Sequence, residues 1–367
     1  MEEKKKALRV VLPIIIGALI GGLAGFFGGA YIDTLHYSWV DMVGFLIGVI
    51  LAVYLQIIAH EGGHLIFGLL TGYRFVSFRI DSFILYKKQG KFHVGRYALA
   101  GTGGQCLMAP PKMQDKTMPY VLYNFGGVLL NLLVSGIAFL LLKCFAWNAL
   151  MNGFLIAAVL IGILFAITNG IPMRLNGVDN DGYNGMSLGK NPKALYAVWL
   201  QLKVNEMQTE GVRLKDMPEE WFLKPSEEDM QNGLIAAIEA MRCNRLLDMH
   251  LLEETNQAIS ESINGKTGMV GIHKMLLQID QVYCEILGER REEILSQFQD
   301  AQLVSFMKAM KNFPAVLRTQ YAYALLIEQD KTKAEGFKNQ FEKAAKNYPL
   351  EGEVESEWEL IRLCEQN

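Results

Sequence analysis

Two histidines and a glutamate stand close together inside an apolar stretch of the sequence. His60, Glu61 and His64 form an H-E-x-x-H motif with apolar residues on both sides. On a helix, the two histidines lie one turn apart on one face, so both imidazoles can bind one Zn²⁺. Glu61 projects beside that face and can take a proton from water at the metal. The motif therefore predicts a zinc site with its own general base.

A chance match is the alternative, because the motif is short. The two histidines would then only pack against neighbouring helices or reach toward the membrane surface. Three ionisable groups in an apolar span are costly unless they are paired, hydrated or bound to metal. That cost favours the metal site, provided a third ligand exists. A carboxylate just after the last apolar span can complete a His₂-carboxylate set, and Asp179 and Asp181 are both candidates.

Composition and charge divide the chain into two halves. It has 367 residues, of which 51% are hydrophobic, and a net charge of -3. Residues 1–185 hold 14 Lys and Arg against 9 Asp and Glu, whereas residues 186–367 hold 21 against 29. We expect a membrane domain over residues 1–185 and a cytoplasmic domain over residues 186–367. The acidic second half gives no electrostatic basis for binding nucleic acid.

Four apolar stretches are long enough to cross a bilayer as helices, which takes about 20 residues. They cover approximately Ala7–Ile32, Met42–Leu70, Met118–Leu142 and Ala149–Ile171. Between the second and third, alternating segments around Phe75–Ile80, Ser82–Tyr86 and Phe92–Tyr97 predict a small β insertion, and Gly101–Gln105 is expected to be a turn. The fold class is therefore mainly α, a polytopic membrane bundle with a small sheet.

The distribution of basic residues predicts the orientation in the cell membrane. Tyr73–Thr117 holds eight Lys and Arg, whereas Asp33–Asp41 holds none. Basic loops stay inside, so Tyr73–Thr117, the N-terminus and the C-terminal half are expected to be cytoplasmic. Five scattered cysteines without a C-x-x-C pair fit a reducing compartment. Periodic segments after residue 185 predict a soluble all-α domain, either a helical-repeat array or a plain bundle.

Asn131 lies deep within the third apolar span. Its side chain could hydrogen-bond to another helix, or it could bind substrate backbone near the metal. The fourth span ends at Pro172, and irregular backbone at membrane depth is tolerated where it lines a watery cavity. Both features place polar groups within reach of the H-E-x-x-H motif.

Three ordered elements together resemble the site-2 protease family of intramembrane zinc metalloproteases. They are His60-Glu61-x-x-His64, then Gly126-Gly127-x-x-x-Asn131, then Asn169-x-x-Pro172 followed by Asp181-Gly182. The resemblance covers about residues 40–185. It implies His60, His64 and Asp181 as zinc ligands, Glu61 as general base, and Asn131 and Asn169 as contacts to substrate. The spacing from Pro172 to the Asp-Gly pair is longer than usual in the family, and Gly182 favours Asp181 over Asp179.

The resemblance implies that the protein is an intramembrane zinc endopeptidase, multi-pass and bacterial. Its substrate would be a membrane protein or peptide, such as a precursor peptide, a signal-peptide remnant or a regulatory membrane protein. The alternative is a catalytically inactive membrane scaffold that recruits a protein partner through residues 186–367. The intact motif argues against the scaffold, because a scaffold has no need of Glu61.

Overall fold

The computed structural model describes residues 38–97, 102–175 and 178–366. The described chain is mostly helical and carries a small four-stranded sheet where the sequence predicts a β insertion. Three of its helices are long and apolar enough to cross a membrane: α2 (Trp39–Leu70), α3 (Val121–Cys144) and α4 (Ala149–Gly170). They correspond to the second, third and fourth predicted spans. The first predicted span, Ala7–Ile32, lies outside the described residues.

The chain divides into two compact units, and the three long helices contribute to both. The described part of the first unit comprises residues 38–55 and 134–161. Its small core is formed by residues of all three helices, including Ala52, Ala138 and Leu155. Gly48 lets α2 approach α4 closely, since a Cβ there would lie 2.7 Å from the carbonyl oxygen of Leu150.

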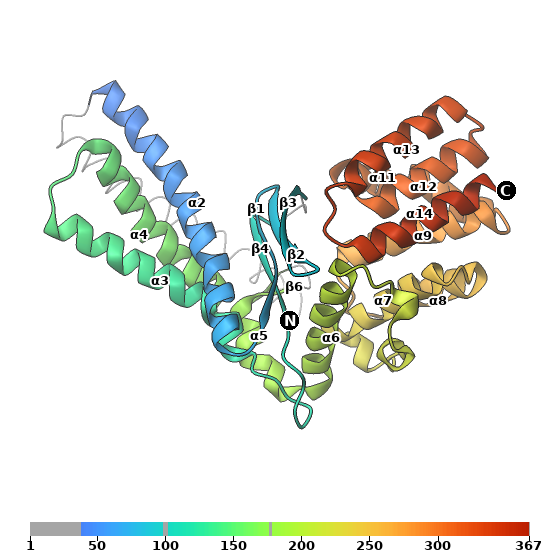
Figure 1. Cartoon of the computed structure of the whole chain (residues 1–367), viewed down its shortest axis with the longest axis horizontal. Helices are drawn as coiled ribbons and strands as arrows, with labels where there is room; N and C mark the ends of the chain where they lie inside the picture. The colour runs from blue at the N-terminus through green and yellow to red at the C-terminus, as the bar shows by residue number, and fades with distance from the viewer. Residues whose placement is uncertain (1–37, 98–101, 176–177, 367) are drawn as a thin grey trace, which may run out of the picture. The chain divides into compact units, whose positions relative to one another are not determined.

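The second unit holds residues 56–133 and 162 onward, and with them the sheet. The sheet is antiparallel with the strand order β3-β2-β1-β4 (Figure 1). Its strands are β1 (Arg74–Ile80), β2 (Phe83–Lys88), β3 (Lys91–Arg96) and β4 (Gly104–Ala109). The first three strands were predicted to within two residues. β4 was not predicted, because the glycines before it indicate a turn.

A second, two-stranded ribbon and a short helix follow α4. The ribbon pairs β5 (Arg174–Leu175) with β6 (Val178–Asp179), and α5 (Asp181–Ser187) begins directly after it. The rest of the second unit is helical (Figure 1). Its helices are α6 (Pro192–Thr209), α7 (Gly233–Asp248), α8 (Leu252–Asn264), α9 (Gly271–Leu287), α10 (Glu292–Leu295), α11 (Ala301–Ala309), α12 (Pro314–Ala322), α13 (Lys331–Ala345) and α14 (Glu351–Glu365).

One hydrophobic core runs from the sheet into these helices. It joins Cys106 and Met108 of β4 to Leu200 and Val204 of α6 and to Ile235 of α7. Because this packing crosses residue 185, the helical region is in direct contact with the elements before it. The domain division at residue 185 stays a prediction.

A buried charged cluster lies within the last helices. Arg318 of α12 is fully buried and contacts carboxylates of Asp280 on α9 and Glu357 on α14. Glu353 lies one turn before Glu357 on α14. Its carboxyl accepts a hydrogen bond from the hydroxyl of Tyr348 at 3.1 Å. Burial and the neighbouring charge of Glu357 raise the pKa of Glu353 to about 8. Burial also raises the pKa of Glu357.

A raised carboxyl pKa makes folding stability depend on pH. Between the ordinary value of 4.5 and about 8, the folded state holds a proton on Glu353 that the unfolded chain has lost. The free energy of unfolding therefore falls as pH rises through this window. We expect Glu353→Gln to raise the melting temperature by a few degrees at pH 8.5 and to change it little at pH 4.5.

Thermal unfolding of the full-length protein in one detergent, followed at both pH values, measures this effect. Glu355→Gln is the matched control, because Glu355 is exposed on the same helix. An equal change for Glu353→Gln at both pH values would contradict the assignment.

Candidate metal centre

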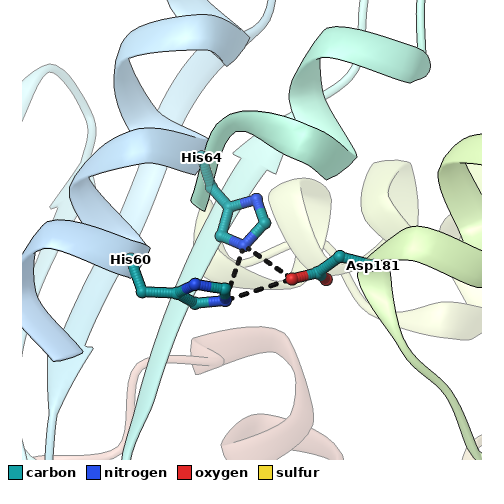
Figure 2. A group of neighbouring side chains, drawn as sticks. All are labelled: His60, His64 and Asp181. Atoms are coloured by element: carbon teal, nitrogen blue, oxygen red, sulfur yellow. Dashed lines mark hydrogen bonds and ion pairs between the residues drawn. The ribbon is translucent and has the colours of Figure 1, made fainter. Parts of the chain in front are cut away.

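The side chains of His60, His64 and Asp181 converge on one point (Figure 2). The two histidines come from successive turns of α2, and Asp181 is the first residue of α5. Nε2 of His60 lies 3.3 Å from Nε2 of His64. Oδ2 of Asp181 lies 3.1 Å from the first nitrogen and 3.4 Å from the second. Residues more than a hundred positions apart thus present one donor atom each to a common centre.

The triangle of donor atoms has the size that a tetrahedral zinc ion requires. Zinc bonds to nitrogen and oxygen at about 2.0–2.1 Å, so two ligand atoms of a tetrahedral site lie about 3.3 Å apart. All three separations are close to that value. Two imidazoles and one carboxylate are also the donor set of zinc sites that keep a fourth position open. The described residues therefore fit a catalytic zinc ion.

Each imidazole is held by a hydrogen bond on the nitrogen that points away from the centre. Nδ1 of His60 lies 2.8 Å from Oδ1 of Asn131, and Nδ1 of His64 lies 2.8 Å from the carbonyl oxygen of Tyr123. Both partners are oxygen acceptors, so each Nδ1 carries the proton. The lone pair of each Nε2 then faces the common centre, which is the tautomer a metal requires.

The contact between Asn131 and His60 extends one step further. Nδ2 of Asn131 donates to the backbone oxygen of Gln56 at 2.8 Å and to its side-chain oxygen at 2.7 Å. Both Asn131 and Gln56 are fully buried. Asn131 thus makes the interhelical hydrogen bonds that were one of its two predicted roles. Its other role, as a contact to substrate, stays a prediction.

Glycines of α3 make room for the histidine helix. Gly63 of α2 and Gly126 of α3 lie backbone to backbone. They are so close that a Cβ at Gly63 would lie 2.1 Å from the carbonyl oxygen of Gly126. The next residue, Gly127, faces the ring of His60, and a Cβ there would lie 2.6 Å from Nδ1. The Gly-Gly pair therefore serves close packing and the seating of His60.

Asn180 connects the end of α4 to the start of α5. As the N-cap of α5, its Oδ1 accepts from the backbone N–H of Tyr183 at 2.9 Å and of Met173 at 3.0 Å. Its Nδ2 donates to the carbonyl oxygens of Thr168 and Ile171 at 2.8 and 2.7 Å. All four hydrogen bonds of this amide are used, and they fix the residue that precedes Asp181.

Close contact between α4 and α5 brings Asp181 to the histidines. A Cβ at Gly182 would lie 2.1 Å from the carbonyl oxygen of Gly170, so only glycine fits after Asp181. Asp179 has a different partner, since Arg174 binds both of its carboxylate oxygens. Burial alone would raise the pKa of Asp181, but the two imidazoles lower it by more than burial raises it. The net shift is downward and keeps this carboxyl ionised.

Glu61 lies against the first residue of β4. A Cβ at Gly104 would lie 2.7 Å from Oε1 of Glu61, so this glycine leaves space for the carboxylate. Buried Arg79 holds the same segment, because its guanidinium donates to the carbonyl oxygens of Asp81 at 2.6 Å and of Gly104 at 3.3 Å. The position of the predicted general base therefore depends on the edge of the sheet.

The centre opens into a cavity of about 650 Å³. His60, Glu61, His64 and Asp181 line it, as does Asn169, whose Nδ2 donates to the carbonyl oxygen of Phe165 at 3.0 Å. Asn184 also lines it, and among the described residues its buried Oδ1 has no hydrogen-bond partner.

Sequence reasoning missed several residues that build the site. Gln56 and Arg79 act through contacts between distant segments, and nothing local in the sequence indicates them. Asn180 had a usable signal, because an asparagine directly before a short helix is typical of an N-cap. Asn184 had a weaker one, as it follows Asp181 by three residues and so lies near it on a helix.

The family model described as Peptidase family M50 matches residues 48–329 of the chain. The chain belongs to this family. The match includes the H-E-x-x-H motif, the Asp-Gly pair and most of the helical region. Membership in M50, together with three apolar helices, identifies a membrane protein of the metalloprotease class, in agreement with the resemblance to site-2 proteases. Comparison with curated proteins and with solved structures found no match.

Replacing Asn131 by alanine tests its hold on His60. Without its acceptor, the imidazole loses its fixed orientation, and we expect zinc affinity to fall by about 10–100-fold. Competition with a zinc chelator on the purified protein measures this affinity. Asn124→Ala is the matched control, since Asn124 lines the same cavity but donates to Tyr120 one turn away. Unchanged zinc affinity in Asn131→Ala would contradict the orienting role.

Replacing Gly104 by alanine tests the seat of Glu61. The added methyl group would displace the carboxylate, and a misplacement of about 1 Å can cost about 10²-fold in rate. We expect a fall of that order in kcat with unchanged zinc content. Gly103→Ala is the control, because its Cβ would come no closer than 3.4 Å to a neighbouring atom. Equal kcat values in the two variants would show that Gly104 gives Glu61 no special space.

Proposed function

We propose that this M50 protein is an intramembrane zinc endopeptidase. The observation that carries the proposal is the triangle of His60, His64 and Asp181 beside the buried carboxylate of Glu61. A protein that only bound metal would need the three ligands but not a fourth ionisable group, Glu61, lining the same cavity. We assign zinc ligation to the first three residues and general-base catalysis to Glu61.

Zinc, when bound, polarises the scissile carbonyl and makes water a stronger acid. Glu61 accepts the proton of the attacking water and delivers it to the nitrogen of the leaving amine. The carboxylate is 9% exposed, so few water molecules compete for it. Its contact with Gly104 limits its movement during both transfers. Asn131 and Tyr123 keep the imidazoles oriented throughout.

The substrate is expected to bind in an extended form beside the sheet. β4 is an edge strand of the sheet, and its residues Gly104, Gln105 and Cys106 line the cavity. An extended peptide can add to such an edge through backbone hydrogen bonds. We also assign Asn169, which lines the same cavity, a contact to substrate. A helical membrane segment would have to unwind before it could bind in this way.

The proposed substrates are membrane-embedded proteins or peptides. α2 has 32 residues, more than the roughly 20 needed to cross the hydrocarbon core. Its histidines stand in the last third, before the basic segment that we place in the cytoplasm. Cleavage would therefore occur near the inner surface of the cell membrane. Precursor peptides, signal-peptide remnants and regulatory membrane proteins all meet this description.

A membrane scaffold without catalytic activity is the second candidate. Its support is the helical region from α6 to α14, which is large enough to bind a protein partner. The two candidates differ in their response to a metal chelator. Chelation would stop an endopeptidase, whereas a scaffold would keep its partner.

Substitution of the proposed base separates the two candidates directly. Glu61→Gln removes the proton acceptor and keeps the shape, so we expect kcat to fall by at least about 10²-fold while zinc content is unchanged. The assay reconstitutes the purified protein with a mixed panel of tagged apolar helical peptides, and mass spectrometry identifies the new termini. Glu219→Gln, at an exposed position, is the control. Equal activity of Glu61→Gln and wild type would exclude the proposed mechanism.

A further inference from the structure

The helix α6, which follows the last proposed zinc ligand in the sequence, forms part of the wall of the catalytic cavity. Val198, Gln201 and Leu202 of α6 line the cavity of about 650 Å³ that also holds His60 and Glu61. Leu234, in the first turn of α7, lines it as well. Three of these four side chains are apolar. They give the cavity an apolar wall, whereas asparagines and the candidate zinc ligands make it polar elsewhere.

The side chains of α6 differ in how deeply they are buried. Ala194, Ala197, Leu200 and Val204 are fully buried in the core shared with the sheet. Val198, Gln201 and Leu202 follow the spacing i, i+3 and i+4, so they form one stripe on the helix surface. Val198 and Leu202 also pack against that core, which includes Leu195 on the same side of the helix. All three are only half-buried. This stripe, which lines the cavity, keeps apolar surface available to a bound molecule.

Several contacts fix this wall in place. Nε1 of Trp199 donates to the carbonyl oxygen of Pro111 at 3.0 Å, which ties α6 to the segment after β4. Nε2 of Gln201 donates to the carbonyl oxygens of Ala197 at 3.1 Å and of Leu234 at 3.2 Å. The amide of Gln201 thus joins α6 to α7 and holds the backbone of Leu234. These hydrogen bonds hold the side of the cavity that α6 and α7 form in a fixed position.

We propose that Val198, Leu202 and Leu234 form an apolar subsite that selects a substrate side chain next to the scissile bond. The inference rests on the proposed endopeptidase function. An apolar side chain would gain about 25 cal/mol for each Å² of surface that it buries there. A charged side chain would lose its hydration at this wall without gaining a partner among the three residues. The enzyme would therefore prefer an aliphatic or aromatic residue at one fixed position relative to the cleaved bond.

This subsite gives the helical region a direct part in catalysis. A substrate strand paired with β4 would lie between the sheet edge and α6, with its backbone on the polar side. Its side chains alternate in direction, so one of them would point toward the apolar stripe. The apolar stripe would therefore contact the side chain of a single substrate residue.

A change of charge in the subsite tests the proposal. Purified wild type, Leu202→Lys and Leu202→Ala are each incubated in detergent with a proteome-derived peptide mixture, and mass spectrometry reads the residues around every cleaved bond. We expect wild type to show a strong apolar preference at one position. Leu202→Lys should lower that preference by about tenfold and favour Asp or Glu there, and Leu202→Ala should admit larger residues. Preferences at the other positions should stay unchanged.

Controls separate failure of the subsite from failure of the endopeptidase. Leu223→Lys places the same charge on an exposed leucine outside the cavity and should cleave like wild type. Zinc content and melting temperature show whether each variant is folded, and Leu202→Ala supplies the test if Leu202→Lys is not. Cleavage by wild type with the same profile in folded Leu202 variants would overturn the subsite alone. If wild type cut no peptide that Glu61→Gln leaves intact, both the function and the subsite would be overturned.

Discussion

In the second unit, α2 and α3 meet at Gly63 and Gly126, where the two helix backbones touch without intervening side chains. This contact decides how near α3 comes to the two histidines. Because the helices are so close, Asn131 and the carbonyl of Tyr123 reach the imidazoles at hydrogen-bond distance. A wider spacing would leave both rings free to rotate. The site therefore depends on the absence of two side chains as much as on the ligands themselves.

Much of the architecture could be predicted from the sequence, and the reasons are physical. The long apolar runs had to be helices because only helices satisfy their own backbone in lipid. The spacing of the two histidines placed them on one face of the helix, and the Asp-Gly pair indicated Asp181 as the residue that lies beside them. β4 was missed because it begins at a glycine and follows two more, and glycines usually mark turns. In this protein Gly104 is a strand residue that leaves room for the carboxylate of Glu61. The need for a glycine there comes from α2, which is distant in sequence.

The remaining features arise from contacts between segments that are distant in sequence. Gln56 and Arg79 have no local pattern, since their partners are set by packing. The same holds for α6, whose half-buried stripe would pass for an ordinary surface of a helical bundle. A boundary at residue 185 follows from the change in charge and hydropathy, yet the hydrophobic core continues across it. Composition indicates whether a segment lies in lipid or in water, but it says little about which neighbours the segment packs against.

The core shared by β4 and α6 also bears on the order in which the protein matures. Chains emerge from the ribosome from the N-terminus, so the histidines of α2 are made well before Asp181 and before the apolar wall of α6 and α7. Until those later segments have been translated and packed against the sheet, the nascent protein has neither Asp181 beside the histidines nor a complete cavity wall. For the endopeptidase proposed above, the active site would thus be completed late in synthesis, and a half-made chain in a crowded membrane would be unable to cut its neighbours.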